Sequence, residues 1–319
     1  MPDAACPTPP DDILPNKGSP HEEESPHGME EGPHAHPPGL VLVSTPIGNL
    51  GDVSTRARHI LKHSDLILCE DTRHSARLLT ALGVGTRTAP LHEHNEDARI
   101  APTLALLRAG KRIALISDAG TPLVSDPGFR LVRAAIAEGL PVTAIPGPNA
   151  AVTALVLSGL PPLPFLFLGF APSRQAARRA SFGALRAAER AGLTATLIWH
   201  EAPHRLAETL ADMVDAFGSR PAAVARELTK HFEEVRRGTL ADLAGHYTGH
   251  PARGEITILL GPPEDNDAED LDGTLRAALR EHSVREAAAL VTAATGLPRK
   301  LVYARALELV RQAEAGTET

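Results

Sequence analysis

Cysteine, aromatic side chains and long apolar runs are scarce in this 319-residue sequence. The two cysteines, Cys6 and Cys69, exclude a disulfide framework and a four-cysteine zinc site, and they fit a reducing compartment. Aromatic residues make up 3% of the chain, so an extensive platform for stacking nucleobases is not expected. The longest apolar runs, such as residues 194–199, are far shorter than the roughly 20 residues of a membrane-spanning helix. We therefore expect a cytoplasmic protein that makes no contact with a membrane.

An excess of positive charge is also absent. The formal net charge is −7, which argues against a generally basic protein that binds any nucleic acid through its phosphates. A local basic patch remains compatible with this charge. No histidine or cysteine pair has the spacing of a structural zinc site, so no metal is expected.

The chain changes character along its length. Residues 1–38 are crowded with proline, glutamate and histidine and lack an apolar stretch, which predicts a disordered tail and does not read as a secretory signal. From residue 39, short apolar runs alternate with helical patterns, which predicts an α/β domain with a mostly parallel sheet covered by helices on both faces. The runs in this part are residues 40–43, 66–69, 112–117 and 142–145.

A proline cluster at residues 160–164 predicts the end of this first domain, residues 39–160. A second α/β domain, residues 161–262, is expected to use the runs at 165–168, 194–199, 222–226 and 255–260. Residues 262–272 are acidic and read as a linker. Beyond them we expect a small helix-turn-helix-like module, residues 273–314, with a break at residues 295–298.

Three loops follow strands of the first domain: residues 44–52, 117–128 and 146–150. In an open parallel sheet, ligands bind beyond the carboxyl ends of the strands, so these loops predict a preformed pocket. The glycines of the first loop do not have the dinucleotide-binding spacing. The second loop reads equally as a turn followed by a helix, in which Asp126 caps the helix and Pro127 takes its first position.

At this point the motifs resemble a known family, the 16S ribosomal RNA cytidine 2′-O-methyltransferases of the tetrapyrrole methylase superfamily. The resemblance runs in one order through nearly all the chain except the tail. Its motifs are Ser44-Thr45-Pro46-Ile47-Gly48-Asn49-Leu50, Glu70-Asp71-Thr72-Arg73, His92-Glu93-His94-Asn95, residues 117–128 and 146–150, His200-Glu201-Ala202-Pro203-His204-Arg205, Arg226-Glu227-Leu228-Thr229-Lys230, Gly254-Glu255 and Thr295-Gly296-Leu297-Pro298-Arg299-Lys300.

The resemblance implies a two-domain α/β fold, distinct from Rossmann-type methyltransferases, with a C-terminal helical module. It also implies S-adenosylmethionine bound in the cleft between the domains, 16S rRNA of the 30S subunit as substrate, and a homodimer. By position, the residues that would contact the donor are Pro46, Asp118, Thr121, Asn149 and Ala150. Two departures stand out: residues 169–175 lack a common Pro-Arg-Lys, and His200 replaces a common aromatic such as tyrosine.

A ribose hydroxyl needs a positioned base before it attacks a methyl group. The candidates are Asp71, Glu93 and Glu201, each acidic and close after a strand-like run, and a cluster that contains Lys230. The sequence does not choose among them, and each carboxylate is more commonly a helix cap or a salt-bridge partner.

Contact with RNA is expected from arginines, whose planar fork matches phosphate. They carry weight only as a group, because a single arginine is most often part of a solvated helix face. The group comprises Arg73, Arg174, Arg178, Arg205 and Arg236.

Two other functions remain open from the residues. One is a tetrapyrrole C-methyltransferase of the precorrin type, which would share the fold and the donor. The other is a non-catalytic DNA-binding regulator built on the C-terminal helices, which leaves the loops at 44–52 and 117–128 without a purpose.

Overall fold

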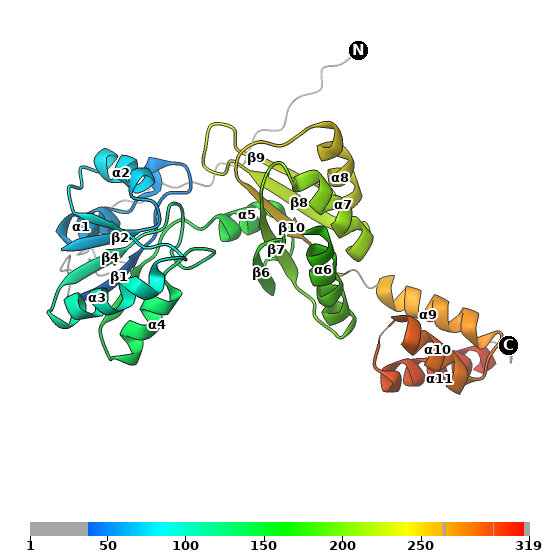
Figure 1. Ribbon diagram of the computed structural model, residues 1–319. Helices are drawn as coiled ribbons and strands as arrows, with labels where there is room; N and C mark the ends of the chain where they lie inside the picture. The colour runs from blue at the N-terminus through cyan, green and yellow to red at the C-terminus, as the bar shows by residue number, and fades with distance from the viewer. Residues whose placement is uncertain (1–37, 264–265, 296, 316–319) are drawn as a thin grey trace, which may run out of the picture. The chain divides into compact units, whose positions relative to one another are not determined.

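The computed structural model describes residues 38–263, 266–295 and 297–315 (Figure 1). The disordered tail predicted for residues 1–38 lies outside the described residues except for Pro38. The described part contains two five-stranded sheets followed by a group of helices. None of its helices is long and apolar enough to cross a membrane.

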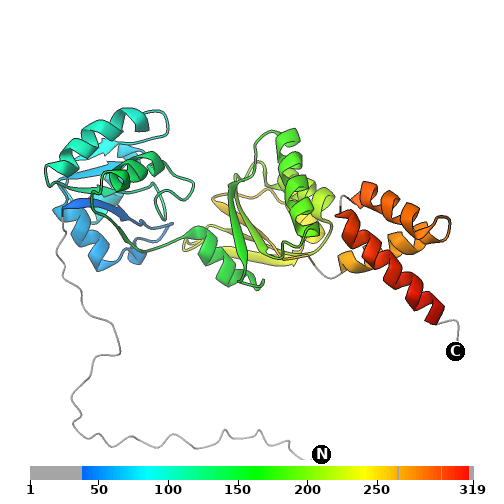
Figure 2. The same ribbon diagram turned by 90° about the horizontal axis from the view of Figure 1, so that it is seen from below.

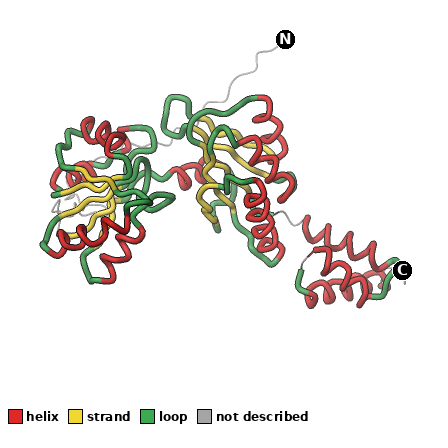
Figure 3. Tube along the Cα trace, viewed as in Figure 1, coloured by secondary structure: helices red, strands yellow, loops and turns green. Residues whose placement is uncertain are grey.

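The first sheet is entirely parallel, with the strand order β3-β2-β4-β1-β5. Its strands are β1 (Gly39–Val43), β2 (Leu66–Cys69), β3 (Thr88–Pro90), β4 (Arg112–Leu115) and β5 (Val142–Ile145). Helices α1 (Thr55–His63) and α2 (Thr72–Ala81) pack on one face, and α3 (Glu96–Arg108) and α4 (Phe129–Ala137) pack on the other. A short 3-10 helix, η1 (Leu50–Asp52), lies in the loop after β1. Figure 3 shows this sheet as strands layered between helices. The predicted parallel sheet with two covered faces is confirmed here.

The second sheet is mixed, with the order β6-β7-β10-β8-β9. Its strands are β6 (Phe165–Phe170), β7 (Thr196–Glu201), β8 (Pro221–Arg226), β9 (Glu234–Thr239) and β10 (Ile256–Leu260). Only β6 and β7 are parallel. Helices α6 (Gln175–Arg190), α7 (Leu206–Phe217) and α8 (Leu240–Gly249) cover one face, with Phe182, Trp199 and Phe217 in the core, while α5 (Ala150–Ser158) packs on the other.

The C-terminal part contains three helices around its own apolar core (Figure 2). They are α9 (Asn266–Leu279), α10 (Val284–Thr295) and α11 (Arg299–Ala315). The first begins inside the predicted linker at residues 262–272, so part of that segment is helical. The turn before α10 was also missed, although Ser283 and Glu286 bond reciprocally there as in a capping box. The domain boundaries themselves stay predictions.

Candidate functional site

The loops after β1, β4 and β5 meet at one edge of the first sheet. Thr45 and Gly120 exchange two backbone hydrogen bonds, of 2.8 and 3.1 Å, which join the first loop to the second. The Thr121 hydroxyl donates to the carbonyl of Pro148 at 3.1 Å and accepts from the Asn149 amide at 3.3 Å, which joins the second loop to the third. These contacts follow from the parallel sheet, because its carboxyl ends all face the same edge.

A cavity of about 260 Å³ opens beside these loops. One part of its wall comes from the loops of the first sheet: Ile47, Asp118, Ala119, Gly120, Thr121, Val124, Ser125, Asp126, Asn149 and Ala150. The rest comes from the second sheet and its loops: Phe170, His200, Glu201, Ala225, Leu228, Glu255, Ile256 and Thr257. The lining therefore combines carboxylates and other polar groups with apolar side chains, as ligand sites usually do.

Four of the five residues predicted to contact the donor line this cavity: Asp118, Thr121, Asn149 and Ala150. Pro46 does not line it, although its neighbour Ile47 does. Asn149 is also the N-cap of α5, because its carboxamide oxygen accepts from the backbone N–H of Val152 at 3.1 Å. Its side-chain NH₂ is directed to Thr121, so one residue fixes both the helix and the loop.

Asp126 was expected to cap α4, and that prediction is wrong. The helix begins at Phe129, and its N-cap is Gly128, which has a φ of 120°. Asp126 lies two residues before this cap. Asp126 instead lines the cavity. Burial, followed by the charge of Glu70, raises the pKa of Asp126 to about 6, although a hydrogen bond with Ser117 opposes the shift.

The surroundings of Asp126 are acidic. Burial and then the charge of Asp118 raise the pKa of Glu70 as well. Carboxylates that raise one another's pKa favour a bound cation or a shared proton. Among the described residues, no group of three or more histidine, cysteine, aspartate or glutamate side chains has the arrangement needed to hold a metal ion.

The predicted bases Asp71 and Glu93 lie outside the cavity lining. Asp71 is the N-cap of α2, and it accepts from the backbone N–H groups of Arg73 at 2.7 Å and His74 at 3.4 Å. These two bonds lower its pKa. Glu93 is exposed, and its carbonyl oxygen accepts from Arg130 at 3.0 Å. Asp71 thus has the role of a helix cap, which suits a group that stays ionised.

Glu201 and Lys230 are both held by partners. Glu201 is 2% exposed and is bonded to the guanidinium of Arg205 and, at 2.7 Å, to the hydroxyl of Thr209. The Nζ atom of Lys230 lies 3.0 Å from Glu227 Oε1 and 2.9 Å from Glu255 Oε2. Burial opposes the lysine charge, but the bonds to Glu255 and Glu227 outweigh it and raise the pKa of Lys230. Lys230 is therefore a fixed cation.

The predicted RNA-binding arginines differ in how far they are exposed to solvent. Arg73 and Arg174 are exposed. Arg236 is partly exposed and pairs with Glu234 at 2.8 Å. Arg205 has a side chain that is 17% exposed and bonds to Glu201. Arg178 has no exposed surface and pairs with Asp212 at 2.5 Å, so the structure gives it a packing role in place of the predicted contact with RNA.

His200 was noted in the sequence only as a departure, yet it lies in the cavity wall. Its Nδ1 atom is 3.2 Å from the hydroxyl oxygen of Thr257, and its ring packs against Phe167 and Phe170. Burial lowers the pKa of His200. The pairing of β7 with β10 that brings Thr257 to this position was not readable from the sequence.

Two family models match the chain. The tetrapyrrole (corrin/porphyrin) methylases match residues 39–244, and the RsmI C-terminal HTH domain matches residues 265–310. The ribosomal RNA small subunit methyltransferase I of Mesorhizobium japonicum is 47% identical over 85% of this chain and 92% of its own length. The protein of the same name from Pseudomonas aeruginosa is 44% identical over 84% of this chain and 96% of its own length.

Two solved structures share the fold alone, because their identity is low. A diphthine synthase has a TM-score of 0.53 at 14% identity and covers 70% of this chain and 89% of its own. The methyltransferase CobJ has a TM-score of 0.52 at 18% identity and covers 70% of this chain and 94% of its own. The tetrapyrrole-methylase-like fold expected from the sequence is confirmed. The family-model matches and the sequence relatives show that the chain belongs to the ribosomal RNA small subunit methyltransferase I family of the tetrapyrrole methylases.

Proposed function

We propose that this protein transfers the methyl group of S-adenosylmethionine to the ribose 2′-oxygen of a cytidine in the 16S rRNA of the small ribosomal subunit. The observation that carries the proposal is the cavity with its acidic and apolar lining, in a chain whose relatives over most of their length are named ribosomal RNA small subunit methyltransferases. The cytoplasm, where ribosomal RNA is found, is the compartment that goes with this proposal.

The cavity lining fits S-adenosylmethionine. The donor is a cation at its sulfonium and ammonium groups, and Asp118, Asp126 and Glu255 supply negative charge. Apolar residues such as Ile47 and Leu228 suit the face of an adenine ring. Gly120 has a φ of +78°, and a Cβ there would lie 3.3 Å from the Ile47 side chain, so glycine suits this position in the cavity wall. When bound, the donor supplies an activated methyl group for in-line displacement.

The contribution of the protein is orientation and removal of a proton. The attacking oxygen has to be held about 3 to 3.5 Å from the methyl carbon. We assign Asp126 as the group that accepts the hydroxyl proton, because it lines the cavity and its pKa of about 6 lies near the operating pH. The Ser117 hydroxyl bonds to the carbonyl oxygens of Ala119 and Gly120 in the same loop, at 3.2 and 3.3 Å.

Lys230 is a positioning residue in this proposal. Its pairs with Glu227 and Glu255 join the loop after β8 to the start of β10, and Glu255 and Leu228 both line the cavity. A base role does not suit an ammonium group that its partners keep protonated. Glu201, itself part of the cavity lining, holds Arg205 and Thr209 in place.

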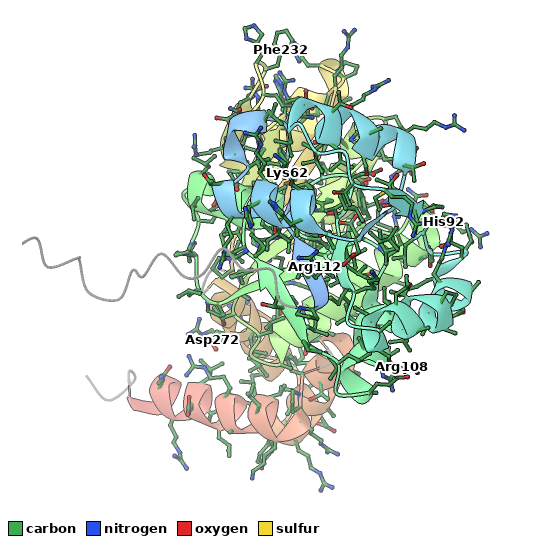
Figure 4. The ribbon with its side chains drawn as sticks, turned by 90° about the vertical axis from the view of Figure 1, so that its left-hand side faces the viewer. Lys62, His92, Arg108, Arg112, Phe232 and Asp272 are labelled. Carbon is green, nitrogen blue, oxygen red and sulfur yellow. The ribbon has the colours of Figure 1, made fainter. Side chains whose placement is uncertain are left out.

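For RNA binding we propose the exposed basic side of the first sheet. Helices α1 and α2 contain no acidic residue. Their exposed cations are Arg56, Arg58, Lys62, Arg73 and Arg77, with Lys62 labelled in Figure 4. Around the second sheet, we propose that exposed Arg174, the N-cap of α6, and partly exposed Arg236 of β9 also contact the RNA. Such a patch neutralises phosphates even though the whole chain is acidic.

A homodimer is part of the proposal. Helix α5 exposes Val152 and Val156, which are 45% and 70% exposed, and the edge strand β6 exposes Phe165 and Leu166, which are 39% and 36% exposed. Exposed apolar side chains of this size are common at protein interfaces. Analytical ultracentrifugation of the wild type and of Val156→Glu tests it: the wild type should be a dimer and the variant a monomer.

The competing functions have less support. A tetrapyrrole substrate shares the fold, but the relatives that are 40–47% identical are named for ribosomal RNA. A non-catalytic DNA-binding regulator leaves the cavity without a use.

One experiment separates the three functions. Purified protein is given labelled S-adenosylmethionine with 30S subunits lacking the modification, with a precorrin-type tetrapyrrole, or with duplex DNA. We expect label in the ribosomal RNA alone, and thermal stabilisation by the donor without any acceptor. Label in the tetrapyrrole would favour the tetrapyrrole C-methyltransferase function instead. Failure of the donor to stabilise the protein removes the methyltransferase function altogether.

A further inference from the structure

The loop between β8 and β9 exposes an aromatic side chain. Phe232 is 68% exposed, and the ring of His231 lies edge-on to it with 4.8 Å between the ring centroids. By contrast, Trp199 of β7, Phe182 of α6 and Tyr247 of α8 are buried in the core on one face of the second sheet. Figure 4 labels Phe232 where it projects from this loop. A mostly exposed ring adds little burial to folding and is available for contact with a ligand.

This loop is held rigidly. Glu227 accepts from the backbone N–H of Glu255 and from Lys230 Nζ, both at 3.0 Å, and Glu233 accepts from the backbone N–H of Thr229 at 2.6 Å. Glu227 and Thr229 have φ values of 49° and 66°, in the left-handed region that non-glycine residues rarely adopt. Such conformations cost free energy and persist only where their surroundings enforce them, which is common at functional sites.

Phe232 is separated by only a few residues of chain from residues that line the cavity. Leu228 and Glu255, which begin and clamp the loop, line the cavity wall. Phe232 follows Leu228 by four residues, so even fully extended chain places it within about 14 Å of that wall. A nucleotide next to the one whose ribose enters the cavity lies in the same range.

The residues on either side of Phe232 in the sequence are polar. Its neighbours in the loop are Lys230, His231 and Glu233, and exposed Arg237 follows in β9. A protein partner is usually recognised by aromatic anchors in the centre of an apolar patch. A single ring face among charges suits a nucleobase, because every base offers a flat surface for stacking and a phosphate for the neighbouring cations.

We propose that Phe232, with His231 against its edge, stacks on an unpaired nucleobase that flanks the methylated nucleotide. The proposal rests on the function proposed above and adds a specific contact to it. It also explains how a chain with few aromatic residues recognises single-stranded RNA: one rigidly presented ring replaces an extended platform.

Steady-state kinetics with unmethylated 30S subunits test the contact. We expect Phe232→Ala to raise the KM for subunits by roughly 5- to 150-fold, the range of one stacked base. The kcat at saturating subunits and the Kd for S-adenosylmethionine should not change. Phe232→Trp should restore the wild-type KM, whereas Phe232→Leu should behave like alanine. Phe129→Ala is the matched control, because Phe129 is 64% exposed and does not line the cavity.

Fluorescence gives a second readout. Trp199 is the only tryptophan and is 1% exposed, so Phe232→Trp adds the only solvent-accessible one. Unmethylated subunits should quench its emission. The proposal is overturned if the KM of Phe232→Ala is within twofold of the wild-type KM and subunits do not quench Phe232→Trp. Methylation by the wild type in the same assay would still support the proposed function. Full activity of Phe232→Leu, or a changed oligomeric state of Phe232→Ala, also overturns it in favour of an apolar protein contact. Loss of methylation in the wild type counts against the function itself.

Discussion

The Nδ1 atom of His200 lies 3.2 Å from the hydroxyl oxygen of Thr257, and the two residues are directly opposite each other on β7 and β10. The imidazole packs against Phe167 and Phe170, with ring centroids 4.9 and 5.6 Å away. Burial lowers the pKa of His200, and the charge of Glu255 opposes the shift only in part. The ring is therefore neutral at neutral pH, which keeps one cation out of a cavity proposed to hold a cationic donor.

This pair predicts a pH dependence of stability. A folded-state pKa below the unfolded value of about 6.5 means that the unfolded chain binds the proton more readily, so the free energy of unfolding falls as pH drops through 6.5. In His200→Phe we expect a smaller fall between pH 8 and pH 5 than in the wild type. Urea denaturation at the two pH values measures it, with exposed His204→Phe as the control. Equal falls in all three proteins would contradict the neutral, buried imidazole.

Asp126 predicts a pH profile of activity. If it accepts the proton, kcat/KM should fall as pH drops through about 6, because protonation removes the acceptor. Asp126→Asn should lower kcat by roughly 100-fold or more, the usual contribution of general base catalysis, and should lose this acidic limb. Asp71→Asn serves as the comparison, because Asp71 lies outside the cavity lining. The same acidic limb in both variants would remove Asp126 from the role.

For Asp126, activity and the free energy of unfolding are expected to change with pH in opposite directions. A carboxyl with a folded pKa above the unfolded value of 3.8 favours folding as pH falls from about 6 towards 4, and opposes it at neutral pH. Because Asp126 is only partly buried, we expect Asp126→Asn to raise the free energy of unfolding at pH 7 by no more than about 1 kcal/mol. Thermal denaturation measures the change. A variant both less active and less stable would indicate a structural role.

Arg178 and Arg174 predict different losses. Arg178 is buried against Asp212, so Arg178→Ala should destabilise the fold by about 3 kcal/mol. Exposed Arg174→Ala should leave stability within about 0.5 kcal/mol but weaken binding to 30S subunits. Urea denaturation and a salt titration of subunit binding separate the two. If Arg178→Ala kept its stability and bound subunits more weakly, while Arg174→Ala bound them like the wild type, the two roles would be reversed.

Much of the fold was predictable because apolar runs become buried strands. The runs at residues 66–69 and 142–145 match β2 and β5 to the residue. Strands β3 and β9 were missed because neither segment contains an apolar run: β3 is Thr88–Pro90 and β9 is largely polar and charged. With β9 unseen, the β8–β9 hairpin and the antiparallel part of the second sheet could not be anticipated.

The place of the site was predictable, but the roles of its acids were not. Loops after parallel strands converge at one edge, so Asp118, Thr121 and Asn149 were placed correctly in the cavity lining. Asp71 and Asp126 were given each other's roles: the expected base caps a helix, and the expected cap lines the cavity. Asp71 directly precedes α2, whereas Asp126 lies in the long loop before α4, two residues before the N-cap Gly128. Side-chain environment of this kind depends on residues far apart in the sequence.

The most direct test of the account is to locate the methyl group. Purified protein, S-adenosylmethionine and 30S subunits lacking the modification are incubated, and nuclease fragments of the 16S rRNA are mapped by mass spectrometry. The account predicts one added methyl group, on the ribose 2′-oxygen of a single cytidine, with Asp126→Asn adding far less in the same time. A methyl group on a base, or unmodified RNA from a protein that binds the donor, would contradict it.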